Sequence, residues 1–207
     1  MTEIDLIVRE LVSAEMTHPI RVGIDGFCAS GKTTLADVLA TKIRALGRNS
    51  MRVSADDFQN PPEIRWQLGA QSPEGFCRFQ VNFSALRSML LEPLGPGGNR
   101  HFRSTLYDVR ESRPNISPER YAETTDVLLL DGLFLHSAEL DNCFDFTVFT
   151  SADFETCLTR ALARNQEGIS DPRELEELYR LKYIPGFALY MQEIHPEDCA
   201  SFVVHTA

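Results

Sequence analysis

The stretch Gly26-Phe27-Cys28-Ala29-Ser30-Gly31-Lys32-Thr33 has the spacing G-x-x-x-x-G-K-[S/T], which is typical of a loop that binds phosphate groups. An apolar run over residues 20–24 precedes it, and residues 34–46 have the pattern of a helix. Gly26 and Gly31 permit positive φ angles, so successive backbone N–H groups can turn toward one phosphate. The N-terminus of the helix adds unpaired N–H groups and the positive end of its dipole. We therefore predict nucleotide binding here; a glycine-rich turn with a chance lysine is the alternative.

The predicted nucleotide-binding residues are Gly26, Phe27, Cys28, Ala29, Ser30, Gly31, Lys32, Thr33 and Thr34. Within this set, Lys32 is expected to reach the β- and γ-phosphates, and the Thr33 hydroxyl to ligate Mg²⁺. Asp131 directly follows the apolar run 127–130, which is the position of the acid that binds Mg²⁺ beside many phosphate-binding loops. The alternative is that Asp131 is only a polar residue at the start of a loop. ATP and Mg²⁺ are the expected cofactors.

The bulk composition limits the kinds of partner. The chain has 207 residues, of which 43% are hydrophobic, and a formal net charge of −10, which fits one soluble globular domain over residues 1–207. The negative field repels polyanions, so we expect no nucleic acid and no membrane as partners, and a small-molecule phosphate acceptor instead. A homo-oligomer is compatible with this composition.

Cysteine usage and hydropathy indicate the compartment. The five cysteines are scattered and form no C-x-x-C pair, which argues against a disulfide framework or a zinc site: Cys28, Cys77, Cys143, Cys157 and Cys199. The first residues are acidic and no apolar run approaches membrane-spanning length. We expect a cytoplasmic protein.

Hydrophobic periodicity predicts alternating strands and helices. Strands are expected at 20–24, 51–54, 127–130, 144–149 and 202–204, and helices at 3–16, 34–46, 84–91, 154–163, 173–183 and 187–194. A loop with one helical turn near Trp66 should extend to about Glu74, and a small β-hairpin insert should cover about 95–120. The pattern predicts a three-layer α/β fold with a mostly parallel five-stranded sheet, whose ligands lie at the carboxyl ends of the strands.

Three candidate sites follow strands and should converge on one crevice: the glycine-rich loop, the pair Asp56 and Asp57, and Asp131. Neighbouring residues in an extended segment point to opposite sides, so one acid of the pair can face the crevice and deprotonate a hydroxyl; the residues alone do not select which.

Arginine and histidine residues add further candidates. Arg160 and Arg164 are spaced i, i+4 and share a helix face, which either closes over the phosphates or is a solvated basic surface. His136 either touches the substrate or, as we favour, makes a structural hydrogen bond.

Several motifs together resemble those of the uridine kinase-like P-loop kinases, a group that includes nicotinamide riboside kinases and phosphoribulokinases. They are the loop from Gly26 to Thr34, Val53-Ser54-Ala55-Asp56-Asp57-Phe58, Tyr107-Asp108-Val109-Arg110-Glu111-Ser112-Arg113 and Leu130-Asp131-Gly132-Leu133. The resemblance spans about residues 20–205 and implies the P-loop kinase fold with a helical lid.

The resemblance also implies roles for individual residues. It selects Asp56 over Asp57 as the catalytic base near Mg²⁺, and it gives Asp131 a part in holding the metal. It places the acceptor against Tyr107, Asp108 and Arg113. It also assigns Arg160 and Arg164 to a mobile lid over about 160–175.

Three departures from the family pattern weaken the link to uridine. Ser112 stands where the family usually has histidine, Gln59 where an aromatic residue is common, and Val81-Asn82-Phe83 where acidic residues are common. We expect an ATP-dependent kinase that transfers the γ-phosphate to the 5′-hydroxyl of a nucleoside such as uridine or cytidine. The alternatives are a kinase of another small hydroxyl metabolite or riboside, and a non-catalytic nucleotide-binding sensor.

Overall fold

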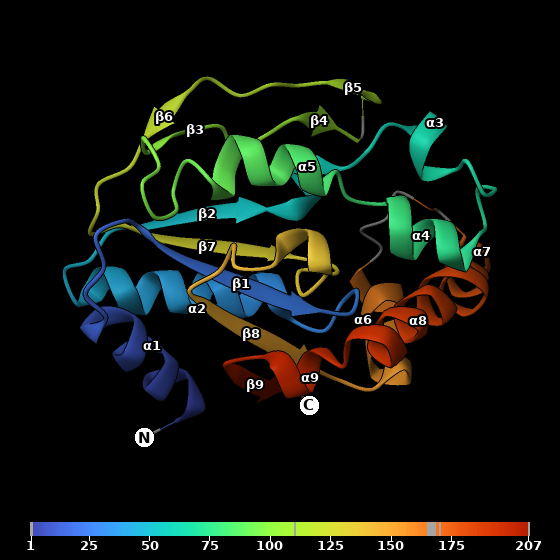
Figure 1. Ribbon diagram of the computed structural model, residues 1–207. Helices are drawn as coiled ribbons and strands as arrows, with labels where there is room; N and C mark the ends of the chain where they lie inside the picture. Colours follow the sequence, from blue (N-terminus) through green and yellow to red (C-terminus); the bar gives the residue numbers. More distant parts are fainter. Residues whose placement is uncertain (1, 110, 165–168, 170, 207) are drawn as a thin grey trace.

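A five-stranded parallel sheet forms the centre of the molecule (Figure 1). The computed structural model describes residues 2–109, 111–164, 169 and 171–206. The strands are β1 (Ile20–Gly26), β2 (Ser50–Ser54), β7 (Val127–Gly132), β8 (Phe146–Ser151) and β9 (Phe202–His205). Their order is β2-β7-β1-β8-β9, and all four neighbouring pairs are parallel. This confirms the predicted fold class.

The two faces of the sheet pack into separate hydrophobic cores. In β7, Val127 and Leu129 join one core, whereas Leu128 and Leu130 join the other, because successive side chains point to opposite faces. The first core includes buried residues of α1 (Glu3–Ser13) and α2 (Lys32–Ala45). Burial on both faces explains the continuous apolar run of this strand.

The second core includes buried residues from the segment after β2 and from most of the remaining helices. These elements are η1 (Ala55–Phe58), α4 (Pro73–Phe79), α5 (Phe83–Leu86) with the π-turn η2 (Arg87–Leu91), η3 (Ala138–Leu140), α6 (Phe154–Arg164), α7 (Pro172–Leu178) with the π-turn η4 (Tyr179–Tyr183) and α8 (Ile184–Ile194). The short helix α3 (Pro62–Arg65) has no buried residue, and α9 (Pro196–Cys199) precedes β9. The sequence pattern does not predict α4, since this short helix begins with Pro73 and contains Gly75. Ser72 caps it by accepting a hydrogen bond from the Gly75 amide at 3.0 Å.

The insert differs in form from the single hairpin that the sequence predicts. It consists of two antiparallel ladders, β3 (His101–Phe102) with β6 (Arg120–Tyr121) and β4 (Tyr107–Asp108) with β5 (Arg113–Pro114). The amide of Leu106 donates to the carbonyl of Asp57 at 2.8 Å, so the insert is joined to η1. Arg110 of the predicted motif lies outside the described residues.

Candidate functional site

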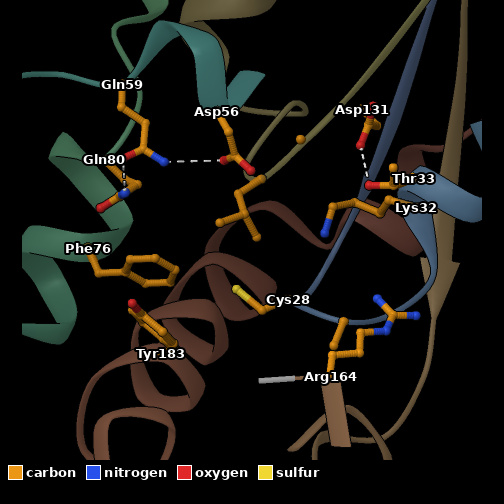
Figure 2. Close-up of a pocket in the computed structure, with 13 residues that line it drawn as sticks. Cys28, Lys32, Thr33, Asp56, Gln59, Phe76, Gln80, Asp131, Arg164 and Tyr183 are labelled. Atoms are coloured by element: carbon orange, nitrogen blue, oxygen red, sulfur yellow. Dashed lines mark hydrogen bonds between the residues drawn. The ribbon is translucent and has the colours of Figure 1, made fainter. Parts of the chain in front are cut away.

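A cavity of about 230 Å³ lies where β1, β2 and β7 end (Figure 2). Its lining comes from the glycine-rich loop, the ends of two strands and the helical segments around them: Cys28, Ala29, Lys32, Thr33, Asp56, Gln59, Phe76, Gln80, Asp131, Gly132, Leu133, Arg164 and Tyr183. In Figure 2, Asp56 faces Lys32 and Thr33 across the open space. The three strand ends therefore converge as parallel strands should.

The glycine-rich loop has the backbone shape of an anion-binding nest. Ala29 and Gly31 adopt positive φ angles of 59° and 98°. Gly31 is also the N-cap of α2 and makes no side-chain cap, so the first N–H groups of this helix are left for another acceptor. Lys32 Nζ donates to the carbonyl of Phe27 at 2.7 Å, which holds the ammonium over the loop.

Gly26 is required for the loop to leave β1. Its φ is 148°, and a Cβ at this position would overlap Thr150 Oγ1 and lie 2.7 Å from the Thr150 carbonyl oxygen. The hydroxyls of Thr150 and Ser30 are 2.6 Å apart, so β8 supports the loop from this side.

Helix α6 supports the loop from another side, and its two predicted arginines lie in different surroundings. Arg160 Nη1 donates to the carbonyl of Ala29 at 3.4 Å and to the Thr206 hydroxyl at 3.2 Å. Arg164, the last residue of α6, lines the cavity. The rest of the predicted lid includes residues 165–168 and 170, which lie outside the described residues.

Asp131 connects the loop to the edge strand of the sheet. Thr33 Oγ1 donates to one oxygen of its carboxylate at 2.7 Å, and Arg52 Nη2 donates to the other at 2.9 Å. Burial raises the pKa of Asp131 above its ordinary value; the Thr33 hydroxyl, Arg52 and Lys32 act in the opposite direction, and the charge of Asp56 adds to the rise.

Of the two neighbouring acids, Asp56 lines the cavity and Asp57 does not. The Asp56 amide donates to Ser54 Oγ at 3.3 Å, and one carboxylate oxygen accepts from Gln59 Nε2 at 3.3 Å. Burial raises the pKa of Asp57, and the charges of Asp56, Asp131 and Asp108 raise it further. This gathering of like charges favours the binding of a cation.

The end of the cavity away from the loop is built by residues that the sequence did not single out for the site. Gln59 and Gln80 provide side-chain amides, and Phe76 and Tyr183 provide rings whose centroids are 4.7 Å apart. They come from the segments after η1 and α4, from α4 itself and from η4, which share no local motif. Only the folded chain brings them together.

Four predicted substrate residues do not line this cavity. Tyr107 is buried in the insert, an Asp108 carboxylate oxygen accepts from the Glu111 amide at 3.0 Å, and Arg113 is exposed. His136 is turned to the interior, where its Nδ1 lies 3.0 Å from Asp25 Oδ2. This contact is the structural hydrogen bond that the sequence favours for His136.

Asp25, a fully buried carboxylate directly before Gly26, is a further residue of this region that the sequence motifs did not indicate. One oxygen accepts from the amides of Gly26 at 2.7 Å and Phe134 at 3.1 Å. The other accepts from the His136 amide at 3.3 Å and from the Tyr190 hydroxyl at 2.5 Å. Asp25 thus joins the phosphate loop to the segment after β7 and to α8. An acid directly between the apolar run 20–24 and Gly26 is the signal that could have revealed it.

Within the described ranges, no group of three or more His, Cys, Asp and Glu side chains is arranged to hold a metal ion. Mg²⁺ sites in phosphoryl-transfer proteins commonly use one or two carboxylates with waters and substrate phosphates, and Thr33, Asp56 and Asp131 match that donor set. Of the helices in the described part of the chain, none has the length and apolar character needed to cross a membrane.

The central parallel sheet and the phosphate loop match the P-loop kinase fold, and comparisons with known proteins agree. No family model matches the sequence. The chain is 26% identical over 164 residues to uridine kinase-like protein 3 of Arabidopsis thaliana, covering 75% of this chain and 33% of the relative. It is 26% identical over 160 residues to a uridine kinase of Lactobacillus helveticus, covering 74% of this chain and 71% of the relative. The chain therefore spans about a third of the length of the first of these relatives.

Solved structures share the fold over nearly the whole chain. A structure of a possible uridine kinase from Bacillus stearothermophilus has a TM-score of 0.73 at 20% identity, covering 98% of this chain and 97% of that one. A candidate fructose transport system kinase from Silicibacter sp. TM1040 has a TM-score of 0.77 at 16% identity, covering 98% of both chains. Sequence and structural relatives together support a uridine kinase-like P-loop kinase, while identities this low leave the acceptor open.

Proposed function

We propose that this protein is an ATP-dependent kinase that transfers the γ-phosphate to the 5′-hydroxyl of a nucleoside. The observation that carries the proposal is that the phosphate loop and the Asp56 carboxylate face one cavity. A phosphate donor and a hydroxyl acceptor can thus meet in a single space, which is the requirement for direct phosphoryl transfer.

The loop side of the cavity suits a triphosphate with Mg²⁺. The backbone N–H groups of residues 27–33 and the N-terminus of α2 would bind the phosphates, and Lys32 and Arg164 would neutralise charge that develops during transfer. The Thr33 hydroxyl and the carboxylates of Asp131 and Asp56 fit a hard cation. Mg²⁺ bound there would neutralise phosphate charge and orient the transferred group.

The opposite side of the cavity suits an uncharged acceptor. Asp56 would accept the proton of the hydroxyl. Beyond it the wall presents the amides of Gln59 and Gln80 and the rings of Phe76 and Tyr183, without a charged group among these four. Amides and rings are suited to the polar edge and flat face of a nucleoside. Tyr107, Asp108 and Arg113 would add contacts from the insert, which is joined to the adjacent Asp57.

The first experiment measures ADP release from ATP and Mg²⁺ with a panel of nucleosides, other ribosides, sugars and small hydroxy acids. We expect the highest kcat/KM with a nucleoside. A sugar or hydroxy acid as the best acceptor would establish the alternative kinase, and binding of ATP without ADP release from any acceptor would favour a sensor.

The second experiment tests the base. Asp56→Asn should lower kcat by roughly 10²- to 10⁴-fold, the usual contribution of a positioned general base, with little change in ATP affinity. Asp57→Asn is the matched control, because it removes the neighbouring carboxylate, which does not line the cavity. Unchanged turnover in Asp56→Asn would contradict the assignment.

A further inference from the structure

We propose that Gln59 positions the Asp56 carboxylate and that Arg65 and Gln80 fix Gln59 for this task. The inference rests on the proposed function, in which Asp56 is the base. Gln59 Nε2 donates to Asp56 Oδ1 at 3.3 Å, while Gln59 Oε1 accepts from Arg65 Nη1 at 3.0 Å and from Gln80 Nε2 at 2.8 Å. Figure 2 shows the row from Gln80 through Gln59 to Asp56 along one wall of the cavity.

These contacts determine which end of the Gln59 amide faces the base. Arg65 can only donate hydrogen bonds, so the group opposite it must be the amide oxygen. Turning the amide over would place its NH₂ group against the donors of Arg65 and Gln80 and its oxygen against a carboxylate. The NH₂ group is therefore directed at Asp56, and the orientation follows from the hydrogen-bond network.

The backbone around Gln59 holds this arrangement in place. Gln59 is only 9% exposed and forms an isolated antiparallel bridge with Val81. The next residue, Asn60, donates from its amide to the Gln80 carbonyl at 3.1 Å, and its side chain donates to the carbonyls of Phe79 and Val81. The segments that carry the two glutamines are thus joined on both sides of the amide contact.

Arg65 directs its charge onto the amide. Burial lowers the pKa of Arg65, and within the described residues no salt bridge joins its guanidinium to a carboxylate. Its Nε is also buried and has no hydrogen-bond partner. A cation donating to Oε1 polarises the amide and strengthens the bond that its NH₂ group donates to Asp56. With one carboxylate oxygen held in this way, the other is left for the acceptor hydroxyl.

Two substitutions at Gln59 separate positioning from packing. Gln59→Glu has nearly the same shape, keeps an oxygen toward Arg65 and Gln80 and adds an ion pair with Arg65, but it turns a second oxygen toward Asp56. Gln59→Leu removes every hydrogen bond of the amide. If Gln59 only supports the fold, both stability and turnover should be better in Gln59→Glu than in Gln59→Leu.

If Gln59 positions the base, Gln59→Glu and Gln59→Leu should rank in opposite orders for Tm and for kcat. We expect Tm to be higher in Gln59→Glu than in Gln59→Leu. We expect kcat to fall roughly 10-fold in Gln59→Leu and about 100-fold in Gln59→Glu, with ATP affinity retained in both, because the carboxylate of the base is misplaced or repelled. Gln67→Leu is the matched control, since Gln67 is exposed and does not line the cavity.

The outcomes separate this inference from the proposed function. Turnover in Gln59→Glu equal to or above that of Gln59→Leu, or wild-type kcat in Gln59→Leu, overturns the positioning role while leaving the kinase assignment in place. Wild-type protein that releases no ADP with any acceptor overturns the proposed function itself.

Discussion

At the scale of single residues, the phosphate loop depends on the space around Gly26. A methyl group there would meet Thr150 and Ser30 at a φ that L-residues rarely adopt. We expect Gly26→Ala to lose about 3 kcal/mol of unfolding free energy, since overpacking adds to backbone strain, and to lose nucleotide binding. Urea unfolding and ATP titration measure the two effects.

The control for this substitution is Gly47→Ala. Gly47 also has a positive φ, 85°, but nothing lies within 4 Å of a Cβ built there. Gly47→Ala should lose only about 1–2 kcal/mol of unfolding free energy, which is the cost of backbone strain, and it should keep its affinity for ATP. Equal losses in the two variants would show that contact with Thr150 is unimportant.

Asp25 supports the same loop from within the core. Tyr190→Phe removes one of its donors and should lower the free energy of unfolding by about 1–2 kcal/mol. Asp25→Ala leaves several buried donors without an acceptor and should cost about 3–5 kcal/mol. Tyr121→Phe is the control, because Tyr121 is 47% exposed. A loss in Tyr121→Phe as large as in Tyr190→Phe would contradict the role of the buried hydroxyl.

Residues could be predicted where chemistry and local pattern coincide. Lys32, Thr33 and Asp131 belong to motifs with fixed spacing next to strong strands, and all three line the cavity. Gln59 and Gln80 are 21 residues apart and interact only because Asn60 and Val81 bring two irregular segments together. Long-range polar contacts of this kind leave no periodic signal in a sequence.

At the scale of elements, α6 places two arginines one turn apart in different surroundings. Arg164 lines the cavity, whereas Arg160 donates to Ala29 and Thr206 behind the loop. We expect Arg164→Ala to lower kcat by roughly 10²- to 10³-fold, as for the loss of one donor to transition-state charge, and to leave Tm nearly unchanged.

Arg160→Ala is the comparison within the same helix. It removes a support of the loop, so it should weaken ATP binding and lower Tm more than Arg164→Ala does. Steady-state kinetics and thermal unfolding of both variants test the distinction. The same kinetic defect in both would mean that they act as one phosphate-binding pair.

Strong strands were predictable at this scale and weak elements were not. The strand over 127–130 is apolar without interruption because both of its faces are buried. The two ladders of the insert have strands of two residues each, too short for any alternation to appear. Their pairing depends on docking, such as the bond from Leu106 to Asp57.

At the scale of the whole molecule, the fold distributes the five cysteines among distinct environments. Cys199 is exposed and Cys28 is half-buried in the cavity wall, whereas Cys77, Cys143 and Cys157 are buried. Burial raises the pKa of Cys77 to about 11, and it also raises the pKa of Cys143 and Cys157. Since the thiolate is the reactive form, burial and the raised pKa both disfavour the reaction of these three thiols near pH 8.

This distribution allows nucleotide binding to be tested without turnover. Maleimide labelling at pH 8, followed by mass spectrometry of peptides, should modify Cys199 quickly, Cys28 more slowly and the three buried thiols only after unfolding. ATP with Mg²⁺ should protect Cys28, because bound phosphates would cover the loop that carries it, and should leave the rate at Cys199 unchanged as an internal control. If ATP does not change the labelling rate of Cys28, the nucleotide binds elsewhere, even if the protein releases ADP. Rapid labelling of Cys77 would instead contradict the packing of α4 against the second core.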